Sequence, residues 1–197
     1  MRLWEQAKKR RRLWLILSTT AAVGFAAALI LTRLFVAGPE SISDPSTIRD
    51  TIPVREAKKR KVHLYFATSN GRHLQAEERR VEASDIHSAV EAIIESLLDG
   101  PSASPLVSTI PAGTELRHLF VTDDRTAYVD FNTDLSNRHP GGVTAERLTF
   151  YAIVNSIALN IEEVERVQLL LDGKPAPTLS GHLDIRHARV ANLLIIR

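Results

Sequence analysis

Three residues near the end of the chain have side chains that bind divalent metals, and they lie within six positions: His182, Asp184 and His187. Imidazole nitrogens and carboxylate oxygens at such spacing are common zinc ligands. No HExxH pair accompanies them, and the segment is predicted to be irregular or strand-like. We therefore interpret them as polar surface residues and predict no metal site. The remaining histidines show no ligand spacing: His63, His73, His87, His118 and His139.

A hydrolase would need a serine on a constrained turn beside a general base. Ser180 precedes His182 by two positions, but the chain has no G-x-S-x-G motif. The glycines at Gly71 and Gly141-Gly142 lack the context of a P-loop or a dinucleotide-binding turn. The chain also contains no cysteine, which excludes thiolate catalysis, disulfides and cysteine-ligated metals. We predict a protein that is not an enzyme and that has no cofactor.

Paired carboxylates could serve in acid–base chemistry, and adjacent acidic residues occur at three places. Neighbouring side chains point to opposite faces of a strand and are about 100° apart on a helix, so the two carboxylates of a pair do not converge. We interpret all three pairs as solvated charge: Glu77-Glu78, Asp123-Asp124 and Glu162-Glu163.

The strands that would position these residues are predicted from short apolar runs bounded by turn residues. The first two runs form a hairpin around Asn70-Gly71, and the next two form a hairpin around the acidic turn at Asp123-Asp124. A fifth run is closed by Asp172-Gly173. The predicted strands are 62–66, 74–81, 116–122, 126–131 and 167–171.

Two helices are predicted, at residues 86–98 and from Thr144 to about residue 161, because apolar side chains recur there with the spacing of one buried face. Ser84 or Asp85 can cap the first helix, and Thr144 can cap the second. Glu146, in the first turn of the second helix, suits the helix dipole. Strand pairs alternating with two helices predict a two-layer α+β domain in which both helices cover one face of a mainly antiparallel sheet.

The N-terminus has the composition of a membrane anchor. Residues 13–32 carry no charged side chain, and at about 1.5 Å per residue a helix of this length spans about 30 Å, the thickness of a bilayer core. Five consecutive cations at 8–12 precede it, so the N-terminus is expected to be cytoplasmic. A cleaved signal peptide is the alternative, although its apolar region is usually shorter. A buried helix of a soluble protein would be expected to show a polar face.

The chain is therefore divided into a cytoplasmic basic segment, a transmembrane signal anchor, a flexible linker with three prolines, and one extracytoplasmic domain. The respective bounds are 1–12, 13–36, 37–61 and 62–197. The expected location is the inner (cytoplasmic) membrane of a bacterium, crossed once, with the membrane as a partner of the N-terminal helix.

The charge of the chain is unevenly distributed. The calculated pI is about 9.1, but residues 62–197 carry twelve Lys and Arg against eighteen Asp and Glu, a formal charge of −6. The excess base belongs to the anchor and to residues 55–61. A nucleic-acid-binding domain needs a basic face, so we predict no nucleic-acid partner.

Several short segments, taken in order, resemble the GerMN domain, a module of GerM-like sporulation and germination proteins and of other bacterial envelope proteins. They span residues 62–187; within the second helix Ala152–Ser156 departs from the Gln and Thr that the family often has. The resemblance implies a non-catalytic module, similar in structure to ring-building domains of sporulation and secretion assemblies, which associate side by side. The segments are Leu64–Phe66, Leu97–Pro101, Ser108–Thr114, Tyr128–Phe131, 148–157, Val167–Gly173 and Leu179–His182.

These observations favour a membrane-tethered envelope module that acts through contacts with envelope proteins or with further copies of itself. The alternative is a domain that binds a glycan or a peptidoglycan fragment. Both tryptophans, Trp4 and Trp14, lie at the membrane segment, so the domain lacks the Trp platforms often found in sugar binders, and we expect no small-molecule ligand. An envelope hydrolase would need a metal or nucleophile site that the sequence does not display.

Overall fold

A computed structural model describes residues 56–102 and 104–197. The predicted anchor at 13–36 and most of the linker lie outside the described residues. Within the described ranges, no helix combines the length and the apolar character needed to cross a bilayer. Both predicted helices and all five predicted strands are present, which confirms a mixed α+β fold. The elements are β1 (Lys58–Ala67), β2 (Leu74–Ala83), α2 (Ile86–Leu98), β3 (Leu116–Val121), β4 (Thr126–Phe131), α3 (Asp134–Asn137), α4 (Val143–Ala158), β5 (Arg166–Leu171), β6 (Lys174–Pro175), β7 (Arg189–Val190) and a 3-10 helix, η2 (Leu193–Ile195).

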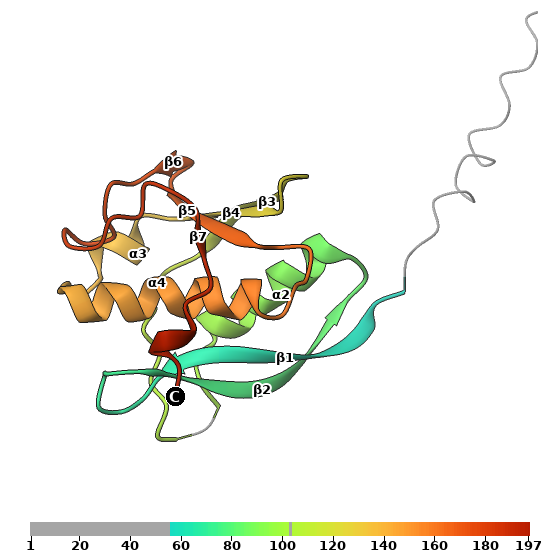
Figure 1. Ribbon diagram of the computed structural model, residues 1–197, viewed down its shortest axis with the longest axis horizontal. Helices are drawn as coiled ribbons and strands as arrows, with labels where there is room; N and C mark the ends of the chain where they lie inside the picture. Colours follow the sequence, from blue (N-terminus) through green and yellow to red (C-terminus); the bar gives the residue numbers. More distant parts are fainter. Residues whose placement is uncertain (1–55, 103) are drawn as a thin grey trace, which may run out of the picture. The chain divides into compact units, whose positions relative to one another are not determined.

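The strands form two sheets, not the single sheet that the sequence predicted. β1 and β2 make an antiparallel hairpin, and the second sheet has the order β3-β4-β5-β6 with β7 paired to β5. β4 and β5 are parallel, and α4 connects them; the other strand pairs are antiparallel. Figure 1 shows α2 and α4 between the hairpin and the larger sheet. The prediction that both helices cover one face of a single sheet is therefore wrong.

The burial of α4 explains this arrangement. A helix that covers one sheet needs one apolar stripe, whereas a helix between two sheets is enclosed on both sides. Ten residues of α4 are buried, and their side chains are not all apolar. The buried polar residues of the helix are Glu146, Thr149, Asn155 and Ser156. Because a buried polar group without a partner is costly, each of them must have a hydrogen bond that fixes a neighbouring segment.

One of these residues, Ser156, and Asn160, which follows the helix, attach the C-terminal end of α4 to the edge of β1 that β2 does not pair. The backbone N–H of Tyr65 donates to Ser156 Oγ at 2.9 Å. Asn160, just beyond the helix, accepts from the N–H of His63 and donates to its carbonyl, both at 2.8 Å. Ser156 and Asn160 thus form the hydrogen bonds with β1 that a neighbouring strand would otherwise form, and this part of the β1 edge is covered.

One core joins the two sheets to the helices. Large side chains from five elements are fully buried in it, while a second, smaller cluster packs Tyr65 and Leu74 of the hairpin against Leu148 of α4. Those of the main core include Phe66 of β1, Ile93 of α2, Phe131 of β4, Ile153 of α4 and Leu169 of β5.

The ends of the elements correct three details of the sequence prediction. Asp85 caps α2 as predicted, and Ser88 completes a capping box. Thr144 does not cap α4, because the helix begins at Val143 after Gly142, which has a φ of 90°. The loop expected before it contains the short helix α3. β1 begins at Lys58, so the last four residues of the predicted linker belong to the strand, where they pair with the end of β2.

The bond between α4 and the β1 edge is testable in the isolated domain. Ser156→Ala leaves the N–H of Tyr65 buried without its acceptor, so we expect the free energy of unfolding to fall by about 1–3 kcal/mol. Urea denaturation measures this value. Ser69→Ala, at an exposed turn position, is the control and should change it by less than about 0.5 kcal/mol. Equal stabilities of the two variants would contradict the assigned role.

Candidate functional site

The structure does not bring the candidate metal ligands together. His182 Nδ1 lies 2.7 Å from Glu146 Oε1, so the ring donates to a buried carboxylate. Asp184 holds the guanidinium of Arg186, with 2.7 Å between Oδ2 and Nη2, and these bonds keep the pKa of Asp184 well below its usual range. His187 is exposed. Across residues 56–102 and 104–197, no group of three or more His, Asp or Glu side chains is placed to hold a metal ion.

Glu146 is the residue whose role the sequence prediction missed. Its carboxylate is fully buried and accepts the backbone N–H groups of His182, at 3.1 Å, and Leu183, at 2.9 Å, besides the His182 ring. Burial alone raises the pKa of Glu146, but the bonds from Leu183, His182 and Ser180 outweigh it and lower the pKa to about 2. Glu146 is therefore more than a partner of the helix dipole: it anchors the loop at 180–183 on the first turn of α4.

A second buried carboxylate anchors the turn that follows β5. Asp130 Oδ1 accepts the N–H of Gly173 at 2.7 Å, and Oδ2 lies 3.2 Å from His118 Nδ1. Gly173 has a φ of 75°, which side chains rarely adopt. The bond joins two of the segments that carry the family resemblance, Tyr128–Phe131 and Val167–Gly173, so these segments have a structural role.

His139 is buried beside Thr149 of α4, and its tautomer follows from its partners. The Thr149 hydroxyl donates to the carbonyl of Thr109 at 2.9 Å, so His139 Nε2 must donate to Thr149 Oγ1, also at 2.9 Å. The ring's Nδ1 then accepts the N–H of Gly141 at 3.0 Å. Acceptance at Nδ1 requires a neutral ring, because both nitrogens of a protonated ring are donors, and burial lowers the pKa of His139. Thr109, His139 and Thr149 border an open cavity of about 490 Å³.

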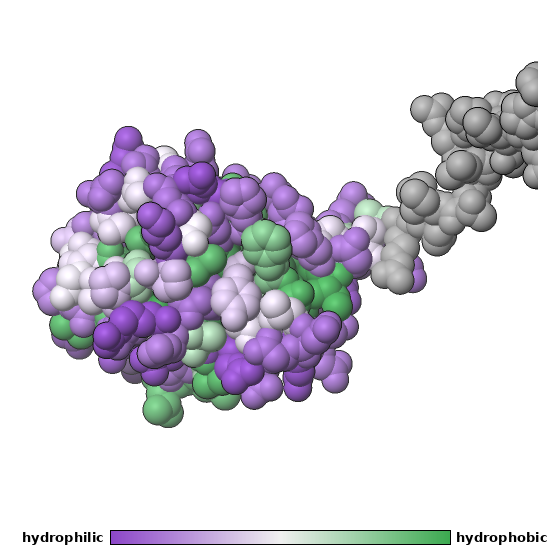
Figure 2. Space-filling model, turned by 90° about the horizontal axis from the view of Figure 1, so that it is seen from above, coloured by the Kyte–Doolittle hydropathy of each residue, from purple (hydrophilic) through white to green (hydrophobic). Residues whose placement is uncertain are grey.

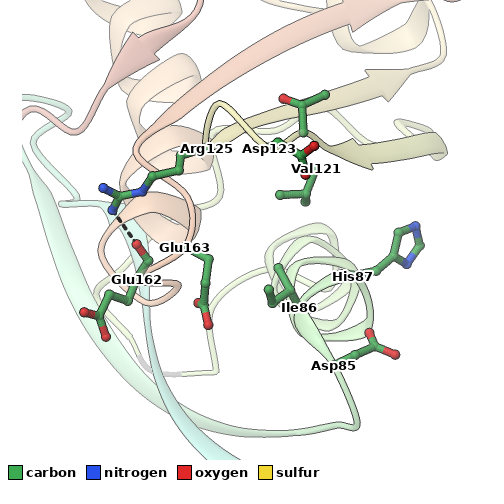
Figure 3. A pocket seen from close by; sticks show the side chains of 9 residues that line it. Asp85, Ile86, His87, Val121, Asp123, Arg125, Glu162 and Glu163 are labelled. Atoms are coloured by element: carbon green, nitrogen blue, oxygen red, sulfur yellow. Dashed lines mark hydrogen bonds between the residues drawn. The ribbon is translucent and has the colours of Figure 1, made fainter.

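A second open cavity is a groove of about 730 Å³ between the start of α2 and the β3–β4 turn. We call it the acidic groove. In Figure 3, Ile86 and Val121 face one another across it, and Glu163 reaches toward it from the loop after α4. The groove is lined by Asp85, Ile86, His87, Val121, Thr122, Asp123, Arg125, Glu162 and Glu163.

The walls of the groove combine negative charge with an apolar floor. Asp123 and the Glu162-Glu163 pair are exposed, as was expected of solvated charges. These carboxylates nevertheless line the same groove, although they are about forty positions apart in the sequence. The cation beside them, Arg125, donates to the carbonyl of Glu162 at 2.6 Å and pairs with Glu165. The groove therefore presents several carboxylates beside a small apolar surface.

Comparison with known proteins identifies the family of this chain. The profile of the Germane family, described as sporulation and spore germination, matches residues 63–177, more than half of the chain. The chain belongs to the Germane family. The match confirms the resemblance to the GerMN domain noted from the sequence. No curated protein sequence matches significantly.

Solved structures show the same fold for this Germane domain. The first GerMN domain of the sporulation protein GerM from Bacillus subtilis has a TM-score of 0.53 at 14% identity, over 68% of this chain and 98% of that one. The tandem GerMN domains of the same protein also give 0.53, at 15% identity, over 68% of this chain but only 46% of the pair. A candidate lipoprotein from Clostridium perfringens gives 0.50 at 18% identity, over 70% of this chain and 89% of that one.

The anchoring role of Glu146 predicts a large loss of stability in the Germane domain when its charge is removed. Glu146→Gln cannot accept all of the bonds from the 180–183 loop, so the free energy of unfolding at pH 7 should fall by about 2 kcal/mol or more. Glu95→Gln, at an exposed position of α2, should change it by less than about 0.5 kcal/mol. Urea denaturation distinguishes these outcomes, and a fully stable Glu146→Gln variant would show that the loop is held by other contacts.

The neutral His139 ring predicts a loss of stability in mild acid. Because folding lowers the pKa of His139 below 6.5, the unfolded chain takes up the proton first. The stability that the neutral ring contributes is therefore complete above pH 6.5, and it is lost as the pH falls from there through the lower pKa of the folded state. Denaturation at pH 7.5 and pH 5.5 should show a smaller difference for His139→Gln than for the native domain, whereas the exposed-site control His187→Gln should behave like the native domain. If His139→Gln showed the same difference in stability between the two pH values as the native domain, this residue would be excluded as the source.

Proposed function

We propose that this chain is a non-catalytic interaction module of the bacterial envelope. The N-terminal helix holds it in the cytoplasmic membrane, the Germane domain lies outside the cytoplasm, and the domain associates with further copies of the chain or with other envelope proteins. The family and the fold support the domain assignment. The basic-then-apolar N-terminus supports the tether, and confinement to a membrane raises the local concentration of a weakly associating domain.

The observation that carries the proposal is how the polar and apolar side chains are distributed. Buried groups that could serve in catalysis, such as Glu146, Asp130 and His139, hold loops in place. Large apolar side chains are exposed instead: Phe120 is 59% exposed and Leu194 is 93% exposed. Figure 2 shows such apolar patches interrupting a mainly polar face. Contiguous exposed apolar patches mark sites of protein association.

The edge of the larger sheet supports the same function. Among the described strands, β3 pairs only with β4, so its other side is an edge. Edge strands are templates for association with a second polypeptide. Phe120 lies on β3 beside His118, with the two rings stacked at a centroid distance of 6.5 Å. The exposed aromatic side chain and the strand edge are thus close together.

The alternative function, binding of a glycan or a peptidoglycan fragment, has less support. Ligand pockets are usually lined by apolar and aromatic side chains around a few polar groups. Neither of the two open cavities described above has a Trp, Tyr or Phe in its lining. We therefore favour a protein partner.

The proposal predicts that the full-length chain forms oligomers in membranes. Amine-reactive cross-linking of native membranes should give dimers and larger adducts. A chain in which the same N-terminal residues 1–55 carry an unrelated monomeric domain should remain monomeric, which controls for association by the helix itself. Recovery of the full-length chain as a monomer without any cross-linked partner would contradict the proposed function.

A further inference from the structure

Among residues 56–102 and 104–197, no cation neutralises three of the carboxylates that line the acidic groove. Within the described residues, the side chains of Asp123, Glu162 and Glu163 form no ion pair, while the nearby guanidinium of Arg166 pairs with Asp124 and that of Arg125 with Glu165. Several like charges around an apolar floor repel one another and attract a cation. The groove is therefore suited to a partner segment that carries more than one positive charge.

The same chain has a segment with this chemistry at the start of β1. Lys58, Lys59, Arg60 and Lys61 are all exposed, and we call them the basic strand end. Lys59 lies 3.7 Å from Glu82 and Lys61 lies 3.0 Å from Glu78, in exposed pairs that contribute little. Alternation along the strand places Lys58 and Arg60 together on one face. In the described part of the chain, neither of these two side chains forms an ion pair.

Within one chain the basic strand end does not fill the groove. Its backbone is held in the hairpin, where Lys58 is opposite Ala83 and Lys61 is opposite Arg80. No ion pair joins it to the groove carboxylates among the residues that the structure describes. As far as the described residues are concerned, the groove and the strand end are therefore both available to a second molecule.

We propose that the acidic groove binds the basic strand end of a second copy of this chain. The inference rests on the proposed self-association and specifies its surfaces. The ammonium of Lys58 and the guanidinium of Arg60 would meet the carboxylates of Asp123, Glu162 and Glu163. The aliphatic parts of the two basic side chains would cover Ile86 and Val121, since long basic side chains pack their stems on apolar surface.

The proposed contact joins two different surfaces of the domain, so it is heterologous. A heterologous contact leaves one groove and one strand end free in each dimer, so it can add further copies and generates rings or open chains. Membrane attachment by the same N-terminal segment would hold all copies at a similar height above the bilayer. The proposed contact therefore fits growth within the plane of a membrane.

The absence of cysteine from the sequence makes the contact testable by site-specific cross-linking. Two full-length chains with different tags are co-expressed, one with Arg60→Cys and the other with Glu163→Cys, and the membranes are oxidised. A disulfide dimer containing both tags is expected. Glu95→Cys, an exposed position of α2 outside the groove, replaces Glu163→Cys in the control and should give at least about fivefold less of the mixed dimer, because a disulfide requires close approach.

Charge reversal provides the second measurement. Two double variants are compared: Lys58→Glu with Arg60→Glu, and Glu162→Lys with Glu163→Lys. Each should lower amine-independent cross-linking of the full-length chain about fivefold or more, since each exposed ion pair contributes a factor of about two to five to the association constant. Combining all four changes in one chain restores the opposite charges and should restore oligomers. A photoactivated cross-linker is used, because these changes alter the number of amines.

The outcomes separate the contact from the proposed function. If oligomers form but the mixed disulfide does not exceed its control, the chain associates through another surface, and the groove contact is wrong. If the combined reversal fails to restore oligomers, the strand end acts on a different anion, such as an anionic lipid, and the contact is again wrong. If the native chain forms no oligomers, the proposed function itself fails.

Discussion

The enclosure of α4 between two sheets is the constraint on which the other features of the domain depend. A helix buried on both sides cannot leave its polar side chains in water, so each one must find a partner in a neighbouring segment. Ser156 meets this need at the edge of β1, Thr149 at the carbonyl of Thr109, and Glu146 at the loop containing His182. One helix thus fixes a hairpin and two loops that are distant in sequence.

The same principle separates the acidic residues into two groups. Glu146 and Asp130 are buried and accept several hydrogen bonds, which makes them parts of the framework. Asp123 and Glu163 are exposed around a groove, and the cations near them are engaged elsewhere. The first group is needed for folding, and the second leaves a surface whose charge can select a partner. This division supports a binding role for a domain whose candidate catalytic residues have structural partners.

The elements that the sequence predicted well are those with local signals. The apolar spacing at 86–98 and the cap at Asp85 define α2, and turn residues define both hairpins. The sequence prediction failed where the cause is tertiary. The partners of Glu146 lie about 36 positions away, and no local pattern indicates that the hairpin and the larger sheet enclose α4 from two sides. The acidic groove was missed for the same reason, because its carboxylates come from three separate segments.

We propose that this domain functions by associating with copies of itself at a membrane. Pulsed electron spin resonance on the full-length chain in bilayers tests it most directly, with a single spin label at Ser69→Cys in an otherwise cysteine-free sequence. Self-association should give a defined distance between labels on neighbouring copies, which disappears when labelled chains are diluted with unlabelled ones. A signal that shows only the random background expected of independent chains would contradict it.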